Sequence, residues 1–186
     1  MSAEQRIARP NATIGLIVAV LVGAAVSVAL GVYGKVHEPR FFAVNVAGFS
    51  SPTAVKAWLA TAVFALAIGQ LLSALLMYGK LPGLTAPPWI GVVHVWSGRA
   101  AVLLSAPVAV HCLYALGFQD GTARVYAHSV LGCFFYGVFV AKMLLLTRKG
   151  LPGWTIPVAG GVTFAGLTGL WLTSSLWFFQ NNGLTF

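Results

Sequence analysis

Five apolar stretches divide the chain, and each is long enough to cross the hydrocarbon core of a bilayer as a helix, which takes about 20 residues. They cover residues 12–33, 55–78, 89–116, 124–146 and 156–179. These runs are continuous and lack the alternating pattern of strands, which favours helices over a β-barrel. We therefore predict an all-α integral membrane bundle of five transmembrane helices, forming a single domain over residues 1–186.

The composition excludes two broad classes of protein. Hydrophobic residues make up 59% of the chain and charged residues only 8%, which is far from the balance of a water-soluble enzyme. The net charge of +8 reflects three acidic residues against eleven basic ones. No dense run of Lys and Arg is present to follow a phosphate backbone, so we expect the lipid bilayer, and not nucleic acid, as the partner.

The positions of Lys and Arg predict the orientation of the bundle, because these residues resist translocation. Arg6 and Arg9 precede the first span, Lys80 follows the second, and Arg148 with Lys149 follow the fourth. With five spans, these three segments share one side. We predict a cytoplasmic amino terminus and expect the bacterial inner membrane as the location.

A short repeat agrees with this topology. Residues 81–87 and 151–157 both read LPGxTxP, and each follows an even-numbered span behind a Lys. They should lie on the same, cytoplasmic face. Two interpretations remain open: Pro/Gly stops that end helices at the interface, or duplicated docking surfaces for a partner.

Small residues recur every fourth position along several spans, as in helices that approach closely in lipid. In the first span these are Gly15, Ala19, Gly23, Ser27 and Gly31. The stripe predicts a surface that faces another helix. Packing alone accounts for it.

Histidines are the main candidates for chemistry. His37 lies in the first connection, whereas His94 and His111 lie in the third span and His128 in the fourth. A histidine in the bilayer interior is costly unless it is paired or ligated, so each of the three in the spans is a functional candidate.

The third and fourth spans form a predicted hairpin about residues 117–122, with Gly117 ending one helix and Thr122 or Asp120 capping the next. His111 and His128 then lie at equal depth, each six residues, or about 9 Å, from its helix end. Two imidazoles that face each other in a bundle can hold a haem iron from both sides. A mutual hydrogen bond, a zinc site lacking further ligands and coincidence remain alternatives.

Neighbouring residues favour a haem at this level. Gly132, one turn from His128, leaves room for a flat macrocycle, and Pro107 can open the helix pair by a kink. Arg124 could hold a propionate through its guanidinium, and Tyr114 approaches the same edge. We expect one bis-histidine haem b, gripped between the third and fourth spans and nearer the outer face.

At this point the chain resembles a known class. Residues 94–99 (HVWSGR), 107–111 (PVAVH) and 124–132 (RVYAHSVLG) are similar to the b-type cytochromes of the cytochrome b561 and ferric-reductase-like class. The resemblance covers the third and fourth spans. It implies a helical bundle with bis-histidine haem b that moves electrons across or along the membrane.

The chain departs from this class in one respect. Such cytochromes often hold two haems, with histidines about fourteen residues apart on one helix face. Fourteen residues inward from His111 and from His128 stand Ser97 and Lys142, so a second haem is doubtful. A site formed by His94 and Met143, which lie at similar depth, remains an alternative.

The inner half of the bundle contains a second polar group, formed by His94, Ser97, Arg99 and Lys142. Arg99 has no acidic partner within the spans, so its charge must be met in another way. A quinone head would suit a histidine beside cations, which stabilise a reduced oxygen and supply protons. Snorkelling of Lys142 and carbonyl bonds from Arg99 are the structural alternative.

These features favour a membrane electron carrier that exchanges electrons between a quinone or a partner redox protein and an acceptor at the outer surface. The chain has no flavin or nucleotide motif, so we expect a subunit of an oxidoreductase, in a homo- or hetero-oligomer, and not a complete enzyme. The alternatives are a haem-free transporter or channel for an anionic solute that uses Arg99, His94 and Lys142, and a structural or assembly subunit.

Overall fold

In the computed structural model, the backbone is described for residues 3–186 and the side chains from Ala12 onward. All regular elements in this part are helices. The α-helices are α1 (Ala3–Val36), α2 (Pro52–Met77), α3 (Ile90–Val110), α4 (Ala123–Leu146), α5 (Thr155–Trp171) and α6 (Trp177–Asn182). Two π-helical turns complete them: η1 (His111–Leu116) continues α3, and η2 (Leu172–Leu176) joins α5 to α6.

Five helical segments of the described chain are long and apolar enough to cross a membrane. They are Ala12–Val36, Pro52–Met77, Ile90–Leu116, Ala123–Leu146 and Thr155–Asn182. The predicted five-helix bundle is confirmed at the level of length and composition, and the chain is indicated to be a membrane protein. The last span is longer than predicted, because η2 and α6 continue α5 without a break. The haem between the third and fourth spans stays a prediction.

The helix boundaries follow local rules. The Ser51 side chain accepts a hydrogen bond from the Ala54 N–H at 3.1 Å, and Pro52 occupies the first turn of α2, where no donor is needed. Thr122 caps α4 in the same way, through the N–H of Val125 at 3.3 Å. Gly117 ends η1 with a φ of 70°, a value that favours glycine. The predicted hairpin turn is therefore confirmed, with Thr122 and not Asp120 as the cap.

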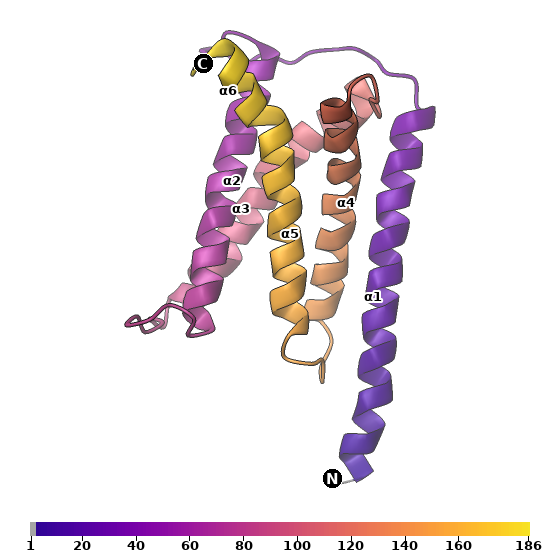
Figure 1. The fold of residues 1–186 in the computed structure, drawn as a ribbon, viewed down its shortest axis with the longest axis vertical. Helices are drawn as coiled ribbons and strands as arrows, with labels where there is room; N and C mark the ends of the chain where they lie inside the picture. The colour runs from indigo at the N-terminus through magenta and orange to yellow at the C-terminus, as the bar shows by residue number, and fades with distance from the viewer. Residues whose placement is uncertain (1–2) are drawn as a thin grey trace.

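The helices alternate in direction (Figure 1). One end of the bundle, which we name the distal end, contains residues 37–51, 117–122 and 183–186. The opposite end contains the amino terminus and the connections 78–89 and 147–154, so both LPGxTxP loops share one end as predicted. Arg6 and Arg9 have side chains outside the described part, and the cytoplasmic assignment of their end stays a prediction.

Helices that are neighbours in sequence are not always neighbours in the bundle. The close pairs are α1 with α4, α2 with α3, α4 with α5, and α2 with α5. Among the described residues, α3 and α4 are not such a pair, although a six-residue turn joins η1 to α4. Figure 1 shows the two helices diverging from the distal end. This divergence leaves room for the candidate site.

The predicted small-residue stripe of the first span packs against α4. Ala19 is only 1% exposed. A Cβ added to Gly23 would lie 2.6 Å from the carbonyl oxygen of Gly137, so the two backbones approach too closely for a side chain. The close approach fixes α1 against α4.

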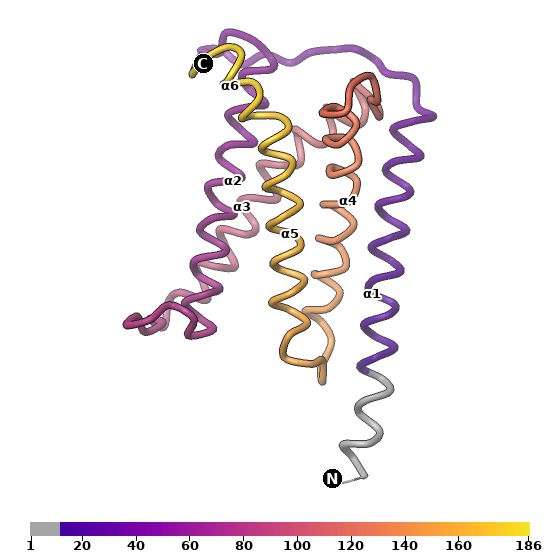
Figure 2. Tube along the Cα trace, in the orientation of Figure 1, coloured from indigo at the N-terminus to yellow at the C-terminus, as the bar shows by residue number. Residues whose placement is uncertain are grey.

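The distal end is closed by two segments. Residues 37–51 cross from α1 to α2, as the trace in Figure 2 shows. The chain after α6 folds back on α2, where the Trp58 indole N–H donates to the Thr185 carbonyl at 2.9 Å and its ring stacks on Phe186 at 4.4 Å. Beneath this contact, Ala54, Ala57 and Phe178 form a buried cluster between α2 and α6.

Candidate functional site: a cavity among α2 to α6

A cavity of about 300 Å³ lies in the distal half of the bundle, in the space between the diverging helices α3 and α4. Its walls come from α2, α3 with η1, α4, α5 with η2, and α6, and they are mainly apolar. The polar or charged side chains in the lining are Thr53, Lys56, Ser105, Gln119, Arg124, His128, Ser129, Tyr136, Thr173 and Ser174. A large apolar pocket with a few convergent polar groups is the usual form of a cofactor or ligand site.

His128 is the one histidine in this lining. Its hydrogen bond to Thr173 shows which ring nitrogen contacts the protein and which faces the cavity. Its Nδ1 lies 3.1 Å from the Thr173 Oγ1. That hydroxyl also donates to the carbonyl of Gly169 at 2.8 Å. If the Thr173 hydroxyl donates to Gly169, it accepts from His128, and the proton of the neutral imidazole is then on Nδ1. The contact with Thr173 engages Nδ1, so Nε2 is the ring nitrogen on the cavity side.

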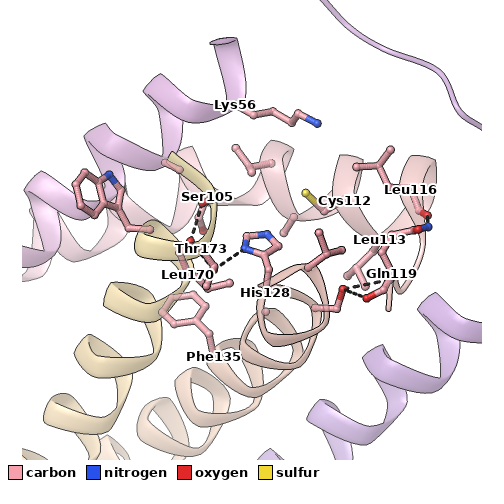
Figure 3. A pocket seen from close by; sticks show the side chains of 18 of the residues that line it. Lys56, Ser105, Cys112, Leu113, Leu116, Gln119, His128, Phe135, Leu170 and Thr173 are labelled. Carbon is pink, nitrogen blue, oxygen red and sulfur yellow. Dashed lines mark hydrogen bonds between the residues drawn. The ribbon is translucent and has the colours of Figure 1, made fainter. Parts of the chain in front are cut away.

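The position of this imidazole is visible in Figure 3. The ring of His128 lies at the centre of the lining side chains, with Thr173 on one side and Cys112 on the other in this view. The side chain of Lys56 extends from α2 above it. The free edge of the imidazole therefore belongs to the cavity and not to a helix contact.

His111 lies elsewhere, and the predicted face-to-face pair is not formed in this structure. It is absent from the cavity lining. Its Nε2 donates to the Phe42 carbonyl at 3.0 Å, and the Phe42 ring meets it edge-on at 5.5 Å. Its Nδ1 is buried and has no hydrogen-bond partner among the described residues. A buried imidazole nitrogen without a partner is costly, so it marks a group in need of one.

Tyr114, predicted at the haem edge, also faces the distal connection. Its ring stacks on His37 at 4.8 Å, and the other face of His37 stacks on Tyr33 at 4.9 Å. His37 Nε2 donates to the Tyr114 carbonyl at 3.1 Å, and the Phe41 N–H donates to the Ala115 carbonyl at 3.0 Å. These contacts satisfy carbonyls of η1 from outside the helix.

Arg124 and Gly132 lie in the cavity wall, as predicted. The guanidinium of Arg124 donates to the Thr173 carbonyl at 2.6 Å and stacks over the Trp177 ring at 3.9 Å. A Cβ on Gly132 would meet only Leu170, at 3.8 Å, so no protein atom demands a glycine there. The glycine simply enlarges the cavity.

The inner polar group is assembled only in part. Ser73 Oγ lies 2.7 Å from His94 Nδ1, and the Gln70 amide donates to the His94 carbonyl and to Ser97 Oγ. Arg99 instead turns onto the Trp96 ring, at 4.8 Å. His94 and Ser97 therefore belong to a hydrogen-bonded contact between α2 and α3, a common way to join membrane helices.

Neither Arg99 nor Lys142 joins these bonds in the described structure. Lys142 lies on α4, and α4 is not a close partner of α3. The predicted quinone group thus stays a prediction.

One electrostatic contact lies at the hairpin turn. The ammonium of Lys35 donates to the Asp120 carboxylate at 2.6 Å, between side chains that are 58% and 57% exposed. This hydrogen bond, with the charge of Lys35, lowers the pKa of the Asp120 carboxyl. The pair ties α1 to the turn between the cavity-lining helices.

Sequence reasoning missed three residues of the site. Lys56 and Thr173 are polar lining residues and Trp177 stacks on Arg124, but none of the three belongs to the third or fourth span. Lys56 could have been noticed as a lone charge inside the second span. Thr173 gives no such signal, because a threonine in an apolar helix usually bonds its own backbone.

The free cysteines also face the cavity. Cys112 and Cys133 both line it as free thiols. They add volume and a polarisable surface to its walls.

No curated protein and no solved structure matches the chain. A family model described as a family of unknown function (DUF6529) matches residues 16–186. The match covers the first membrane span from residue 16 onward, the other four spans in full, and every residue of the cavity lining. The chain therefore belongs to DUF6529.

Proposed function

We propose that the chain is a membrane-embedded b-type cytochrome that binds one haem b in the cavity between α3 and α4. In this role it carries electrons between a quinone or a partner redox protein and an acceptor at the distal end. It acts as a subunit of a larger oxidoreductase in a cell membrane. The inner-face quinone, the redox partner and the bacterial inner membrane belong to the same proposal.

The observation that carries this proposal is the free Nε2 of His128. Metal-binding histidines commonly donate their other ring N–H to an oxygen, which fixes the tautomer and the ring orientation. The bond from Nδ1 to Thr173 has this form, at 3.1 Å. The arrangement supports His128 as a residue that would hold a haem iron, because its Nε2 lies on the cavity side of the ring.

The walls of the cavity suit a flat, apolar body. Small side chains, including Ala60, Ala109 and Gly132, come from three different helices. Apolar walls exclude water from a bound macrocycle, and the fixed ring of His128 limits its rotation. When bound, haem b supplies one-electron chemistry at its iron.

His111 is the proposed second ligand. Its Nδ1 is buried without a described partner, and its Nε2–H is oriented by the Phe42 carbonyl. Both imidazoles thus have one nitrogen bonded to the protein and one free. His111 is outside the cavity lining, so ligation by both requires η1 to shift. A π-helical turn is an irregular segment that often accompanies a functional site.

The haem-free alternative, an anion pathway through Arg99, His94 and Lys142, receives less support. Arg99 is stacked on Trp96, and His94 is bonded to Ser73. Two of the three side chains in that alternative, Arg99 and His94, are therefore engaged in contacts within α3 or with α2.

The experiment is a visible spectrum of the protein purified after expression with adequate haem. We expect a reduced-minus-oxidised spectrum of haem b in the wild type and its loss in His128→Ala. The matched control is His94→Ala, because His94 makes the same kind of bond to a helix hydroxyl but lies outside the cavity. Its spectrum should be unchanged.

A colourless wild-type protein would reject the proposal. Normal spectra in His128→Ala would reject His128 as the ligand. Loss of the spectrum in both histidine variants would show that the assay reports the integrity of the bundle and not ligation.

A further inference from the structure

The cavity contains two basic side chains and no acidic one. Lys56 from α2 and Arg124 from α4 both line it, and none of the lining residues is Asp or Glu. A charge in a mainly apolar, partly enclosed space interacts strongly with any opposite charge that enters it. The local imbalance therefore favours a ligand that brings negative charge.

Arg124 is held in a fixed position. One N–H bonds the Thr173 carbonyl at 2.6 Å, and the guanidinium plane lies over Trp177 at 3.9 Å. A guanidinium has five N–H donors, so further donors remain for a ligand. Its position in the first turn of α4, where free backbone N–H groups add partial positive charge, disfavours a cation and favours an anion.

Lys56 supplies the second charge from across the cavity. It lies on α2, one residue before Ala57 of the buried cluster, and its side chain extends over the ring of His128 (Figure 3). Within the described residues no ion pair involves it, because the one ion pair there joins Lys35 to Asp120. Its side chain is partly buried, and its ammonium has no counter-charge among the described residues.

We infer that Lys56 and Arg124 form an anion-binding end of the cavity, which recognises the carboxylates of a largely apolar ligand. The inference rests on the proposed function for the identity of that ligand, in which the carboxylates are the two haem propionates. A fatty acid would present the same chemistry. In either case the apolar body lies along His128, and the carboxylates point toward the distal end.

The test compares two probes with the same macrocycle, iron protoporphyrin IX and its dimethyl ester, in which both carboxylates are replaced by uncharged methyl esters. Each is titrated into the purified protein, and binding is followed by the change in visible absorbance. We expect the wild type to bind the free acid about tenfold or more tightly than the ester, since hydrogen bonds to charged groups contribute about 1.5–3 kcal/mol. Lys56→Met should reduce this ratio severalfold and leave ester binding nearly unchanged.

Lys142→Met is the matched control, because Lys142 is also a lysine within a span but lies outside the cavity lining. It should retain the wild-type ratio. Lys56→Gln keeps a polar side chain without the charge and serves if the Met variant does not fold. Equal affinity of the wild type for acid and ester would overturn the inference, as would an unchanged ratio in both Lys56 variants.

A parallel titration separates this inference from the proposed function. If neither porphyrin binds, the cytochrome proposal fails, and oleate is then compared with oleyl alcohol. Preference for oleate that is lost in Lys56→Met would support the anion-binding end with a fatty acid as ligand. No preference for oleate would overturn the inference as well.

Discussion

Thr173 of η2 is hydrogen-bonded to the His128 ring on α4, with 3.1 Å between Oγ1 and Nδ1, and its hydroxyl also bonds the Gly169 carbonyl at 2.8 Å. The helix pair that forms one wall of the cavity thus also holds the one histidine in its lining. Removing the acceptor should leave Nδ1–H without a partner and free the ring to rotate.

Thr173→Val is nearly isosteric and removes only the hydroxyl. We expect haem affinity to fall about 10- to 100-fold, as for other outer partners of metal-bound histidines. Thr173→Ser restores the oxygen and should recover most of the affinity together with the midpoint potential, measured by redox titration. A Val variant with wild-type affinity and potential would remove Thr173 from the site.

Whether His111 also binds the proposed haem iron can be measured separately, from the spin state of the iron. With both His111 and His128 bound, the iron should be low-spin and should not bind carbon monoxide; His111→Ala should make it high-spin and reactive with carbon monoxide. Electron paramagnetic resonance and carbon monoxide difference spectra measure this. A wild type that is already high-spin would mean that His111 does not reach the iron, leaving His128 as the only histidine ligand.

The α1–α4 crossing makes a packing prediction. In Gly23→Ala the new Cβ would lie 2.6 Å from the Gly137 carbonyl oxygen, so the backbones must separate. We expect a loss of about 1–3 kcal/mol in the free energy of unfolding, measured by thermal or denaturant unfolding in detergent. Gly160→Ala is the matched control, because its Cβ would meet nothing within 4 Å. Equal effects of the two substitutions would contradict this assignment.

The Lys35–Asp120 pair predicts a small loss of folding stability at acidic pH. Since the folded-state pKa of Asp120 is lowered, the pair stabilises the fold above the ordinary carboxyl pKa, about 3.9, and this contribution is lost as the pH falls through the lower folded value. Lys35→Met should raise the pKa of Asp120 toward its ordinary value, as carbon-13 NMR of the carboxyl would show. An unchanged titration in Lys35→Met would assign the shift to another group.

The features that depend only on residues close together in the sequence could be predicted. Span positions follow from apolar runs of sufficient length, and the hairpin turn follows from Gly117 and Thr122, whose conformational and capping preferences are strong. The stripe containing Ala19 and Gly23 also predicted a buried face, because only small residues permit so close an approach. Each of these depends on residues near one another in sequence.

The orientation of side chains around the cavity could not be predicted in the same way. His111 was placed opposite His128 by depth alone, but depth does not fix the direction in which a side chain leaves its helix. The change from α3 to the π-helical η1 begins at His111 itself, and the distal connection provides the Phe42 carbonyl as a competing acceptor. Arg99 similarly turned onto Trp96 of its own helix.

The order of helix contacts constrains biogenesis. In a chain synthesised from the amino end, α1 must wait for α4 before it gains its close partner, and α2 gains its contact with α5 last of all. Thr173 and Trp177 are made later still, so the cavity has no complete wall until synthesis is nearly finished. Loading of the proposed haem would then follow translation, and a chain stalled after α4 should enter the membrane but remain a target for quality-control proteolysis.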